Sequence, residues 1–134
     1  MVVQIGPHTV EVEGDCTLVR LHGTFTLAHM KTWCDLVDAV IAEHGHVFTI
    51  SDFSGGGDFP ADARLHVRHW PNVVYIRGTA IFGASIAATV VVLMMARVTR
   101  LVRKYSLPTT AVKTEREARA WIDELRKKLP SPRN

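Results

Sequence analysis

Two pairs of histidines are the groups in this chain whose spacing comes closest to that of metal ligands. His44 and His46 are separated by one residue, and His66 and His69 by two. Zinc sites use nitrogen and sulfur ligands at such short spacings, but they need a third or fourth ligand. Neither pair has one at a suitable distance along the sequence, so we expect ordinary histidines of intermediate burial and no metal or cofactor.

The sequence shows no residue pattern typical of nucleophilic or acid–base catalysis. The two cysteines, Cys16 and Cys34, lack the spacing of a metal site. Cys34 falls on the apolar stripe of an expected helix, where a thiol belongs to the core. No Ser-His-Asp or Cys-His arrangement follows from the order of the residues. The sequence therefore predicts a protein that acts by binding and not as an enzyme.

A glycine-rich loop is the strongest candidate for a binding surface. The candidate residues lie in this loop and in the helix start that follows it: Ser54, Gly55, Gly56, Gly57, Asp58, Phe59, Arg64 and Arg68. Free amides at a helix start can bind an anion, but neither a P-loop nor a dinucleotide-binding motif is present. Asp58 and Asp62 would also repel phosphate. A flexible connection and a surface for a protein partner are the alternatives that remain.

The longest uncharged stretch covers residues 78–96, and its length is that of a membrane-spanning helix. A strand ending at residue 82, a turn with Ser85 as helix N-cap and a helix over 86–104 account for the same residues. This second interpretation keeps a regular alternation of strands and helices. We therefore favour it over a one-pass membrane protein.

The helix expected over 86–104 is apolar on nearly all sides at its start. Burial, cover by a second copy in a homodimer, and the wall of a cavity for a lipid or other apolar ligand are the explanations left open. We favour burial with dimerisation. Candidates for contact with an apolar ligand are Ile86, Val90, Leu93 and Met94.

The same helix is basic at its end. The basic side chains there are Arg97, Arg100, Arg103 and Lys104. Cations at the end of a helix complement the helix dipole. The functional alternative is a basic surface that faces an anionic membrane or an acidic partner.

Composition places the chain among globular domains. Its 134 residues are 47% hydrophobic and 22% charged, which suffices for one domain with a real core. The net charge of +3 is too small to indicate nucleic-acid binding. The first residues lack a basic stretch followed by an apolar one, and two cysteines make no disulfide framework, so we expect a cytoplasmic protein.

Strand and helix patterns alternate along the chain. Strands are expected over residues 9–13, 16–22, 46–52, 77–82 and 110–113, and helices over 26–44, 60–70, 86–104 and 114–129. This order, β-β-α-β-α-β-α-β-α, predicts an α/β domain with a mixed sheet of about five strands and about four helices. The whole chain, 1–134, forms one domain in this interpretation, with its core over about 9–129 and a tail over 130–134.

With this order of elements, the chain resembles the STAS / SpoIIAA-like superfamily. The resemblance rests on Asp-Phe-Ser-Gly at 52–55, Ala-Ile-Phe-Gly at 80–83 and Thr-Glu-Arg-Glu-Ala-Arg-Ala-Trp-Ile at 114–122. The branch most similar to this chain comprises short bacterial STAS-like proteins grouped with the CRAL-TRIO lipid-transfer fold. The resemblance implies a regulatory module that binds a protein partner, as anti-sigma factor antagonists do, with lipid binding as the alternative.

One departure from the family pattern concerns phosphorylation. In the SpoIIAA branch, a serine in an Asp-Ser-Ser-Gly at a helix start is phosphorylated. The matching segment here, residues 58–62, reads Asp-Phe-Pro-Ala-Asp and has no serine. Ser51 and Ser54 are nearby hydroxyls, but neither matches the regulated position. The resemblance therefore implies a STAS-type module without that form of control.

Overall fold

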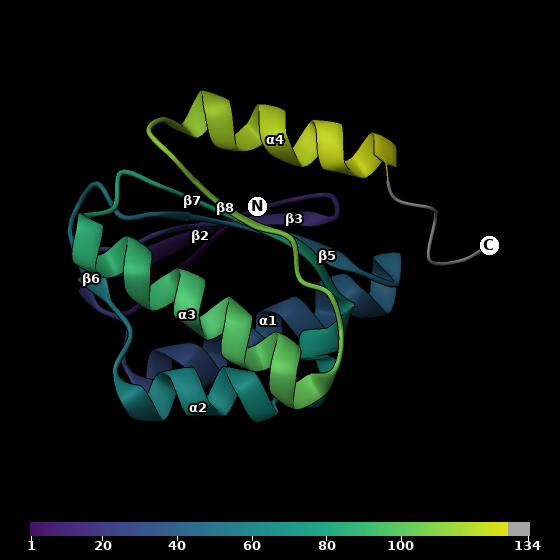
Figure 1. Cartoon of the computed structure of the whole chain (residues 1–134). Helices are drawn as coiled ribbons and strands as arrows, with labels where there is room; N and C mark the ends of the chain where they lie inside the picture. Colours follow the sequence, from purple (N-terminus) through teal and green to yellow (C-terminus); the bar gives the residue numbers. More distant parts are fainter. Residues whose placement is uncertain (129–134) are drawn as a thin grey trace.

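The computed structural model describes residues 1–128, which form a six-stranded sheet with helices on both faces (Figure 1). The strands follow the order β1-β2-β3-β5-β7-β8 across the sheet. Their bounds are β1 (Val2–Ile5), β2 (His8–Glu13), β3 (Cys16–Arg20), β5 (Val47–Asp52), β7 (Ile76–Phe82) and β8 (Thr109–Val112). The predicted tail, 130–134, and the predicted helix end at residue 129 lie outside the described residues.

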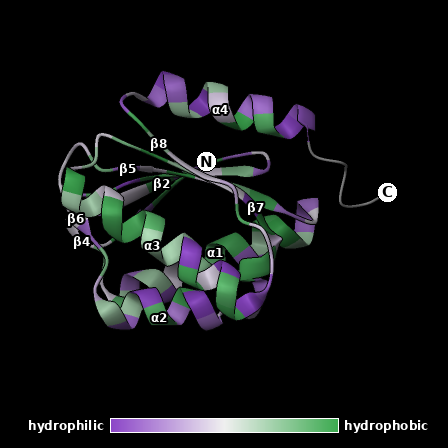
Figure 2. Ribbon diagram, in the orientation of Figure 1, coloured by the Kyte–Doolittle hydropathy of each residue, from purple (hydrophilic) through white to green (hydrophobic). Residues whose placement is uncertain are grey.

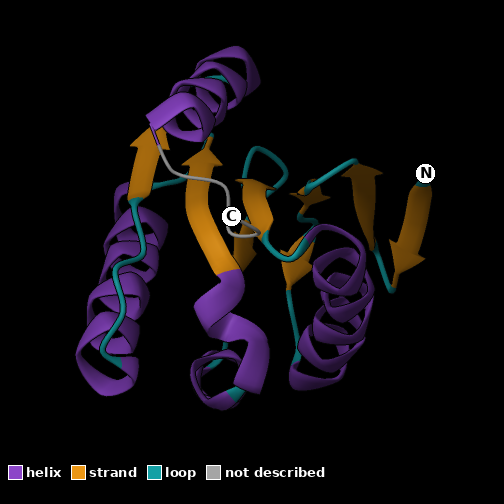
Figure 3. Ribbon diagram, turned by 90° about the vertical axis from the view of Figure 1, so that its right-hand side faces the viewer, coloured by secondary structure: helices purple, strands orange, loops and turns teal. Residues whose placement is uncertain are grey.

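Parallel and antiparallel pairs divide the sheet into two halves. β1, β2 and β3 pair antiparallel through tight turns, whereas β3, β5, β7 and β8 pair parallel. Parallel neighbours need long crossover connections, which the helices supply. The helices are α1 (Leu27–His44), α2 (Ala61–His69), the 3-10 helix η1 (Pro71–Tyr75), α3 (Ile86–Arg103) and α4 (Glu115–Lys128). Figures 1 and 3 show α1, α2 and α3 on one face of the sheet and α4 on the other.

The predicted α/β class, mixed sheet and four α-helices are confirmed, but the number of strands was predicted too low. β1 was missed, although it pairs with β2 from Val2 opposite Glu11 to Ile5 opposite His8. Two further strands, β4 (Gly23–Thr24) and β6 (Gly57–Asp58), pair with each other in a second sheet. Strands of two residues have no periodicity, so no sequence pattern reveals them.

Helix α1 forms within the range 26–44 that its apolar stripe predicts. Its N-cap, Thr26, accepts the backbone N–H of His29 at 3.2 Å, and His29 Nδ1 accepts the backbone N–H of Thr26 at 3.1 Å. Gly45 ends the helix with φ 82°. The buried residues of α1 are Met30, Trp33, Cys34, Val37, Val40 and Ile41. Cys34 is therefore a core residue, and burial raises the pKa of its thiol to about 12.

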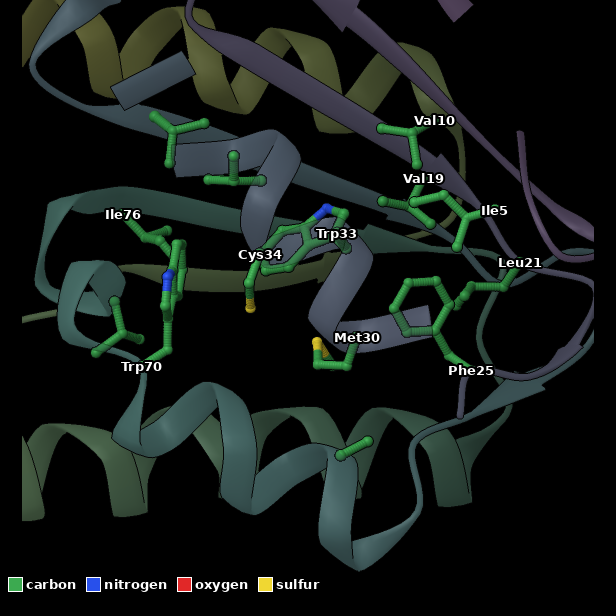
Figure 4. Packing of buried hydrophobic residues seen from close by; sticks show 14 of the residues in the cluster. Ile5, Val10, Val19, Leu21, Phe25, Met30, Trp33, Cys34, Trp70 and Ile76 are labelled. Carbon is green, nitrogen blue, oxygen red and sulfur yellow. The ribbon is translucent and has the colours of Figure 1, made fainter. Parts of the chain in front are cut away.

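Two hydrophobic cores lie on the two faces of the sheet. The larger one fills the space between the sheet and α1, α2 and α3, where Met30, Trp33 and Cys34 pack among strand residues and Trp70 (Figure 4). The smaller one lies beneath α4 and includes Ala118 and Ile122. An apolar cavity lies within the larger core, beside α1, α2 and α3.

Ion pairs hold α4 against the sheet. Arg20 at the end of β3 lies 2.7 Å from Glu11, 3.1 Å from Asp52 and 2.9 Å from Glu115, measured between nitrogen and carboxylate oxygen. Partial burial would lower the pKa of Arg20, but hydrogen bonds to these carboxylates raise it. At the helix start, Thr114 Oγ1 caps α4 by accepting the backbone N–H of Glu117 at 3.2 Å.

The long uncharged stretch folds as the second interpretation predicts. β7 ends at Phe82, Gly83 turns the chain with φ 70°, and Ser85 caps α3 by accepting the backbone N–H of Ala88 at 3.1 Å. Within residues 1–128, no helix combines the length and apolarity needed to cross a membrane.

Candidate functional site

Asp52, the first residue of the Asp-Phe-Ser-Gly segment, fixes the turn that begins the glycine-rich loop. Its Oδ1 accepts the backbone N–H of Ser54 at 2.8 Å, and its Oδ2 lies 3.1 Å from Arg20. Partial burial would raise the pKa of Asp52, but hydrogen bonds from Ser54 and Arg20 prevail and lower it. Asp52 is thus an ionised structural residue, whose side chain is already occupied by the turn and the ion pair.

The glycine-rich loop is tied down by β6, in contrast to the flexible loop that its composition predicts. The backbone N–H of Gly23 donates to Gly56 at 3.0 Å, and the backbone N–H of Phe25 donates to Asp58 at 2.9 Å. The hydroxyl of Thr24 also donates to the Asp58 carboxylate at 2.8 Å. The glycine content of the loop predicts flexibility, but it does not reveal the pairing with β4, which is distant in the sequence.

A hollow of about 310 Å³ lies between this loop, the start of α2 and the start of α3. Its lining residues are Phe53, Gly57, Asp58, Phe59, Arg64, Ser85, Ala87, Ala88, Val91 and Val92. Half of the eight predicted partner-binding candidates, Gly57, Asp58, Phe59 and Arg64, belong to this lining. The wall contributed by α3 was missed, because residues 85–92 carry no charged side chain and lie far from the loop in the sequence.

Aromatic packing holds one wall of the hollow in place. Phe59 meets Phe25 with ring centroids 5.9 Å apart and Phe53 with centroids 5.7 Å apart, both nearly edge to face. The carbonyl of Phe59 accepts a hydrogen bond from Arg64 at 2.7 Å, which orients the guanidinium. The exposed Asp58 and the half-buried Arg64 therefore place opposite charges beside an apolar depression.

The other four candidates lie outside the hollow. Ser54, Gly55 and Gly56 are exposed on the loop beside it. A Cβ added at Gly55 would lie 2.8 Å from the carbonyl oxygen of Leu21, so only glycine fits there. Arg68 sits one turn beyond Arg64 on α2, and its buried Nε has no hydrogen-bond partner in the described part of the chain.

A second, apolar cavity of about 110 Å³ lies between the sheet and α1, α2 and α3. Residues of α3 that line it are Val92, Met95, Ala96 and Thr99. On the sheet side, the hydroxyls of Thr49 and Thr79 are hydrogen-bonded to each other at 2.9 Å. These two hydroxyls satisfy each other, whereas the indole N–H of Trp33, which also lines the cavity, has no hydrogen-bond partner among the described residues.

The four residues predicted to contact an apolar ligand do not line this cavity. Ile86, Val90, Leu93 and Met94 are 87%, 49%, 42% and 59% exposed, on the outer side of α3. The explanation that α3 is wholly buried is therefore wrong. A helix that is apolar on nearly all sides has no periodicity that tells its inner from its outer face.

The basic residues at the end of α3 lie in two different environments. Arg103 turns inward and donates to the carbonyls of Arg68 and Trp70, both at 3.2 Å. Arg97, Arg100 and Lys104 are exposed. Within residues 1–128, no hydrogen bond or ion pair is formed by these three side chains. Three of the four predicted basic residues thus remain available at the surface.

The histidine pairs have separate surroundings. His46 Nε2 lies 2.8 Å from Asp15, and His46 Nδ1 lies 3.1 Å from the carbonyl of His44. His66 and His69 lie on α2. Over the described residues, no three His, Cys, Asp or Glu side chains are grouped as a metal ion would require.

No protein-family model and no curated protein matches the chain. Among the solved structures that resemble it, two do so over most of its length. The anti-sigma factor antagonist SpoIIAA in its unphosphorylated form has a TM-score of 0.52 and 19% identity, over 89% of this chain and 97% of that chain. The chain has a SpoIIAA-like (STAS) fold. An uncharacterized protein of the DUF3478 family from Shewanella loihica PV-4, also with a SpoIIAA-like fold, has a TM-score of 0.54 and 16% identity, over 85% and 90% of the two chains.

These matches confirm the fold that the sequence resemblance predicts. At such low identity they show the fold alone, and function depends on the surfaces of this SpoIIAA-like chain itself.

Proposed function

We propose that this chain is a non-enzymatic regulatory module of STAS type that binds a protein partner. The observation that carries the proposal is the hollow between the glycine-rich loop, α2 and α3. Its lining combines two aromatic rings, short apolar side chains and one charge of each sign. Protein-binding sites use this combination, with an apolar pocket for an anchoring side chain and polar groups at its rim.

The proposed partner presents a bulky apolar side chain with a charged residue on either side. Ala87, Ala88 and Val91 leave room between α3 and the loop for such an anchor. Asp58 and Arg64 then select the flanking charges. Because the loop is already held by β6, little conformational entropy is lost when a partner binds, which favours affinity.

Regulation in this proposal does not use a phosphoserine at the start of α2. That helix begins at Ala61 after Pro60, and residues 58–62 contain no serine. The concentration of the partner, or of a competitor for the hollow, would instead determine what fraction of the protein is bound. The similar structure of SpoIIAA is that of an anti-sigma factor antagonist in its unphosphorylated form.

A substitution that fills the hollow tests the proposal. Removing Phe59 would disturb its contacts with Phe25 and Phe53, so a change on the opposite wall is cleaner. Ala87 is exposed and lines the hollow, and Ala87→Trp would occupy it without breaking a hydrogen bond. The matched control is Ala120→Trp, at an exposed position of α4 on the other face of the sheet.

The probe is a library of random peptides displayed on phage and selected on the immobilised wild-type chain. We expect enriched peptides with an aromatic or large aliphatic residue that bind the wild type and the Ala120→Trp variant alike. The Ala87→Trp variant should bind them at least about tenfold more weakly, a loss of about 1.4 kcal/mol. Equal binding to all three proteins, or no enrichment at all, would refute the hollow as a partner site.

A lipid or other apolar ligand in the inner cavity is the second candidate function. The cavity is apolar and α3 forms one of its walls, which favours such a ligand. Its volume of about 110 Å³ is below the roughly 300–1,000 Å³ of most ligand pockets. A ligand of lipid size would therefore need α3 to move away from the sheet.

Native mass spectrometry of the chain purified without detergent distinguishes the two candidates. A discrete added mass of lipid size would favour the carrier function. A protein mass with nothing attached, together with peptides selected at the hollow, would favour the partner-binding module.

A further inference from the structure

The outer face of α3 collects most of the apolar surface that the protein exposes. Six of the ten large hydrophobic side chains exposed in residues 1–128 belong to this helix. They are Ile86, Val90, Leu93, Met94, Leu101 and Val102. Figure 2 shows the hydrophobic colour running along α3, at the surface of the helical layer. Contiguous apolar surface of this kind marks a contact with something outside the chain.

These side chains form one stripe, into which arginines are set. Ile86, Val90, Leu93, Arg97 and Arg100 follow one another at steps of three and four residues, so they share one side of the helix. Met94 and Leu101 flank Arg97 by the same steps. The stripe extends for about 22 Å along the helix axis, at 1.5 Å per residue. We define Ile86, Val90, Leu93, Met94, Arg97, Arg100 and Leu101 as the α3 stripe.

Charge is strongly segregated along the sequence, and α3 lies in the basic part. Residues 63–114 contain eight Lys or Arg and no Asp or Glu, a formal charge of +8. The remaining residues contain eight Lys or Arg and 13 Asp or Glu, a charge of −5, and the two add to the net +3. A modest net charge therefore conceals a strongly basic segment, which contains α3.

A second copy of the chain is a poor cover for the stripe. In a two-fold contact the same face meets itself, so Arg97 and Arg100 would face another basic, apolar stripe. No carboxylate lies within residues 63–114 to pair with them. Two buried guanidinium groups without partners would oppose such a dimer. The occupant must instead supply negative charge.

A protein partner fits the stripe less well than a lipid surface. α3 is a convex helix at the edge of the sheet, with no aromatic residue between Ile86 and Arg103 (Figure 3). Binding hot spots between proteins favour Trp and Tyr in packed pockets. Aliphatic side chains beside arginines suit an anionic membrane surface, where the former enter the acyl boundary and the latter extend to the phosphates.

We propose that the α3 stripe docks the chain reversibly on an anionic phospholipid membrane, with α3 lying in the plane of the interface. This goes beyond the proposed partner site, which uses the hollow at the start of α3 and a different side of that helix. Each arginine near an anionic surface contributes on the order of 1 kcal/mol. Apolar contacts add to this, so binding requires both parts of the stripe.

Co-sedimentation of the full chain with vesicles tests the docking. Vesicles of equal parts phosphatidylcholine and phosphatidylglycerol are compared with vesicles of phosphatidylcholine alone. We expect at least about tenfold tighter binding to the anionic vesicles. Arg97→Gln with Arg100→Gln should weaken that binding about 30-fold, at about 1 kcal/mol per arginine.

A charge-matched pair of changes provides the control. Arg116→Gln with Lys128→Gln removes the same charge from exposed positions of α4, across the sheet. That variant should bind within about threefold of the wild type, because surface charges remote from the membrane are screened. An equal loss in both variants would show general electrostatic attraction and overturn the proposal.

The apolar part of the stripe is tested by Met94→Gln with Leu101→Gln. Both side chains are exposed, at 59% and 66%, so the fold should be unaffected and its thermal midpoint unchanged. Vesicle binding should fall at least about tenfold. Failure of the wild type to sediment with anionic vesicles would overturn the proposal. So would sedimentation equilibrium that shows a wild-type dimer and a monomeric Met94→Gln, Leu101→Gln variant, because a second copy would then cover the stripe.

Discussion

Helices α1 and α3 have the same length, 18 residues, and lie on the same face of the sheet, yet they differ in what they bury. α1 buries six side chains, whereas α3 buries only Val92 and Thr99. The exposed positions of α1 hold alanine, threonine or charged residues, such as Lys31, Asp35 and Glu43. The exposed positions of α3 hold Ile86, Met94 and other large hydrophobics instead.

The positions of the two helices explain the difference. α1 packs between the sheet and α2, and Trp70 closes over it (Figure 4). α3 lies beside β8 at the edge of the sheet, with α2 as its helical neighbour (Figure 3). Hydrophobic composition is similar in both, so burial is decided by the neighbours available. The apolar surface that α3 retains is free for binding, whereas that of α1 stabilises the fold.

Replacing a methionine by alanine on each helix tests the difference between α1 and α3 most directly. Met30 on α1 is 4% exposed, whereas Met94 on α3 is 59% exposed. Met30→Ala should lower the free energy of unfolding by about 2–5 kcal/mol, because it removes buried atoms and enlarges a cavity. Met94→Ala should change it by less than about 0.5 kcal/mol. Urea unfolding measures both, and equal losses would mean that α3 is covered by something in solution.

A hydrogen bond across the helical layer gives the next largest effect. Asp38 on α1 accepts the indole N–H of Trp70 at 2.9 Å and the amide of Asn72 at 2.7 Å. Asp38→Ala leaves the buried indole N–H without a partner and should cost about 1–3 kcal/mol. Asp35→Ala, at an exposed position of the same helix, is the control and should stay within about 0.5 kcal/mol. If the two variants unfold alike, the indole has another partner.

The sequence predicts α1 and most of the sheet because their signals are local. The stripe of α1 recurs at helical steps, and Thr26 and Gly45 mark its ends. β1 has only four residues, and its pairing with β2 is needed to recognise it. For α3, the sequence predicts the helix from Ser85 onward, but not which side faces the sheet. That choice depends on the cavity and on β8.

The candidate site is predictable only in part for a related reason. Gly57, Asp58, Phe59 and Arg64 are near one another in the sequence, so loop composition points to them. Residues 85–92, which complete the hollow, come more than 20 residues later and are uniformly small or apolar. Only the crossover from β7 brings the start of α3 to the loop. Strand β4 constrains the loop in the same long-range manner.

The inner side of α3 is loosely packed. A substitution that fills the cavity there tests whether α3 can be stabilised where α1 cannot. Ala96 faces the cavity of about 110 Å³, which can hold three more carbon atoms. Ala96→Leu should raise the free energy of unfolding by about 1 kcal/mol, since each buried methylene contributes about 0.8 kcal/mol before strain is subtracted. Ala42→Leu, at an exposed position of α1, should have no such effect. A thermal midpoint lowered by Ala96→Leu would show that this space is already filled.

The smallest expected effect is a pH dependence at the start of α1. His8 is fully buried beside Phe25 and His29, with both ring centroids 4.9 Å from its own. Its Nδ1 accepts the backbone N–H of His22 at 3.0 Å, and its Nε2 donates to the carbonyl of Thr24 at 3.1 Å. Burial lowers the pKa of His8 from 6.5, with smaller effects of the same sign from His29 and His22 and an opposing one from the Thr24 carbonyl.

The sign of the pH effect follows from this lowered pKa. Above about pH 6.5 the ring is neutral in both the folded and the unfolded chain, so its full contribution to stability is present. Below that pH the unfolded chain takes up a proton first, and stability falls until the folded pKa is passed. His8→Gln should therefore reduce the loss of stability between about pH 7 and pH 5.5, measured by urea unfolding, whereas the exposed His69→Gln should not. Equal slopes in all three proteins would mean that the ring of His8 takes up a proton as readily in the folded chain as in the unfolded one. That outcome would also weaken the comparison of α1 with α3, because the space that His8 shares with His29 of α1 would then be open to water.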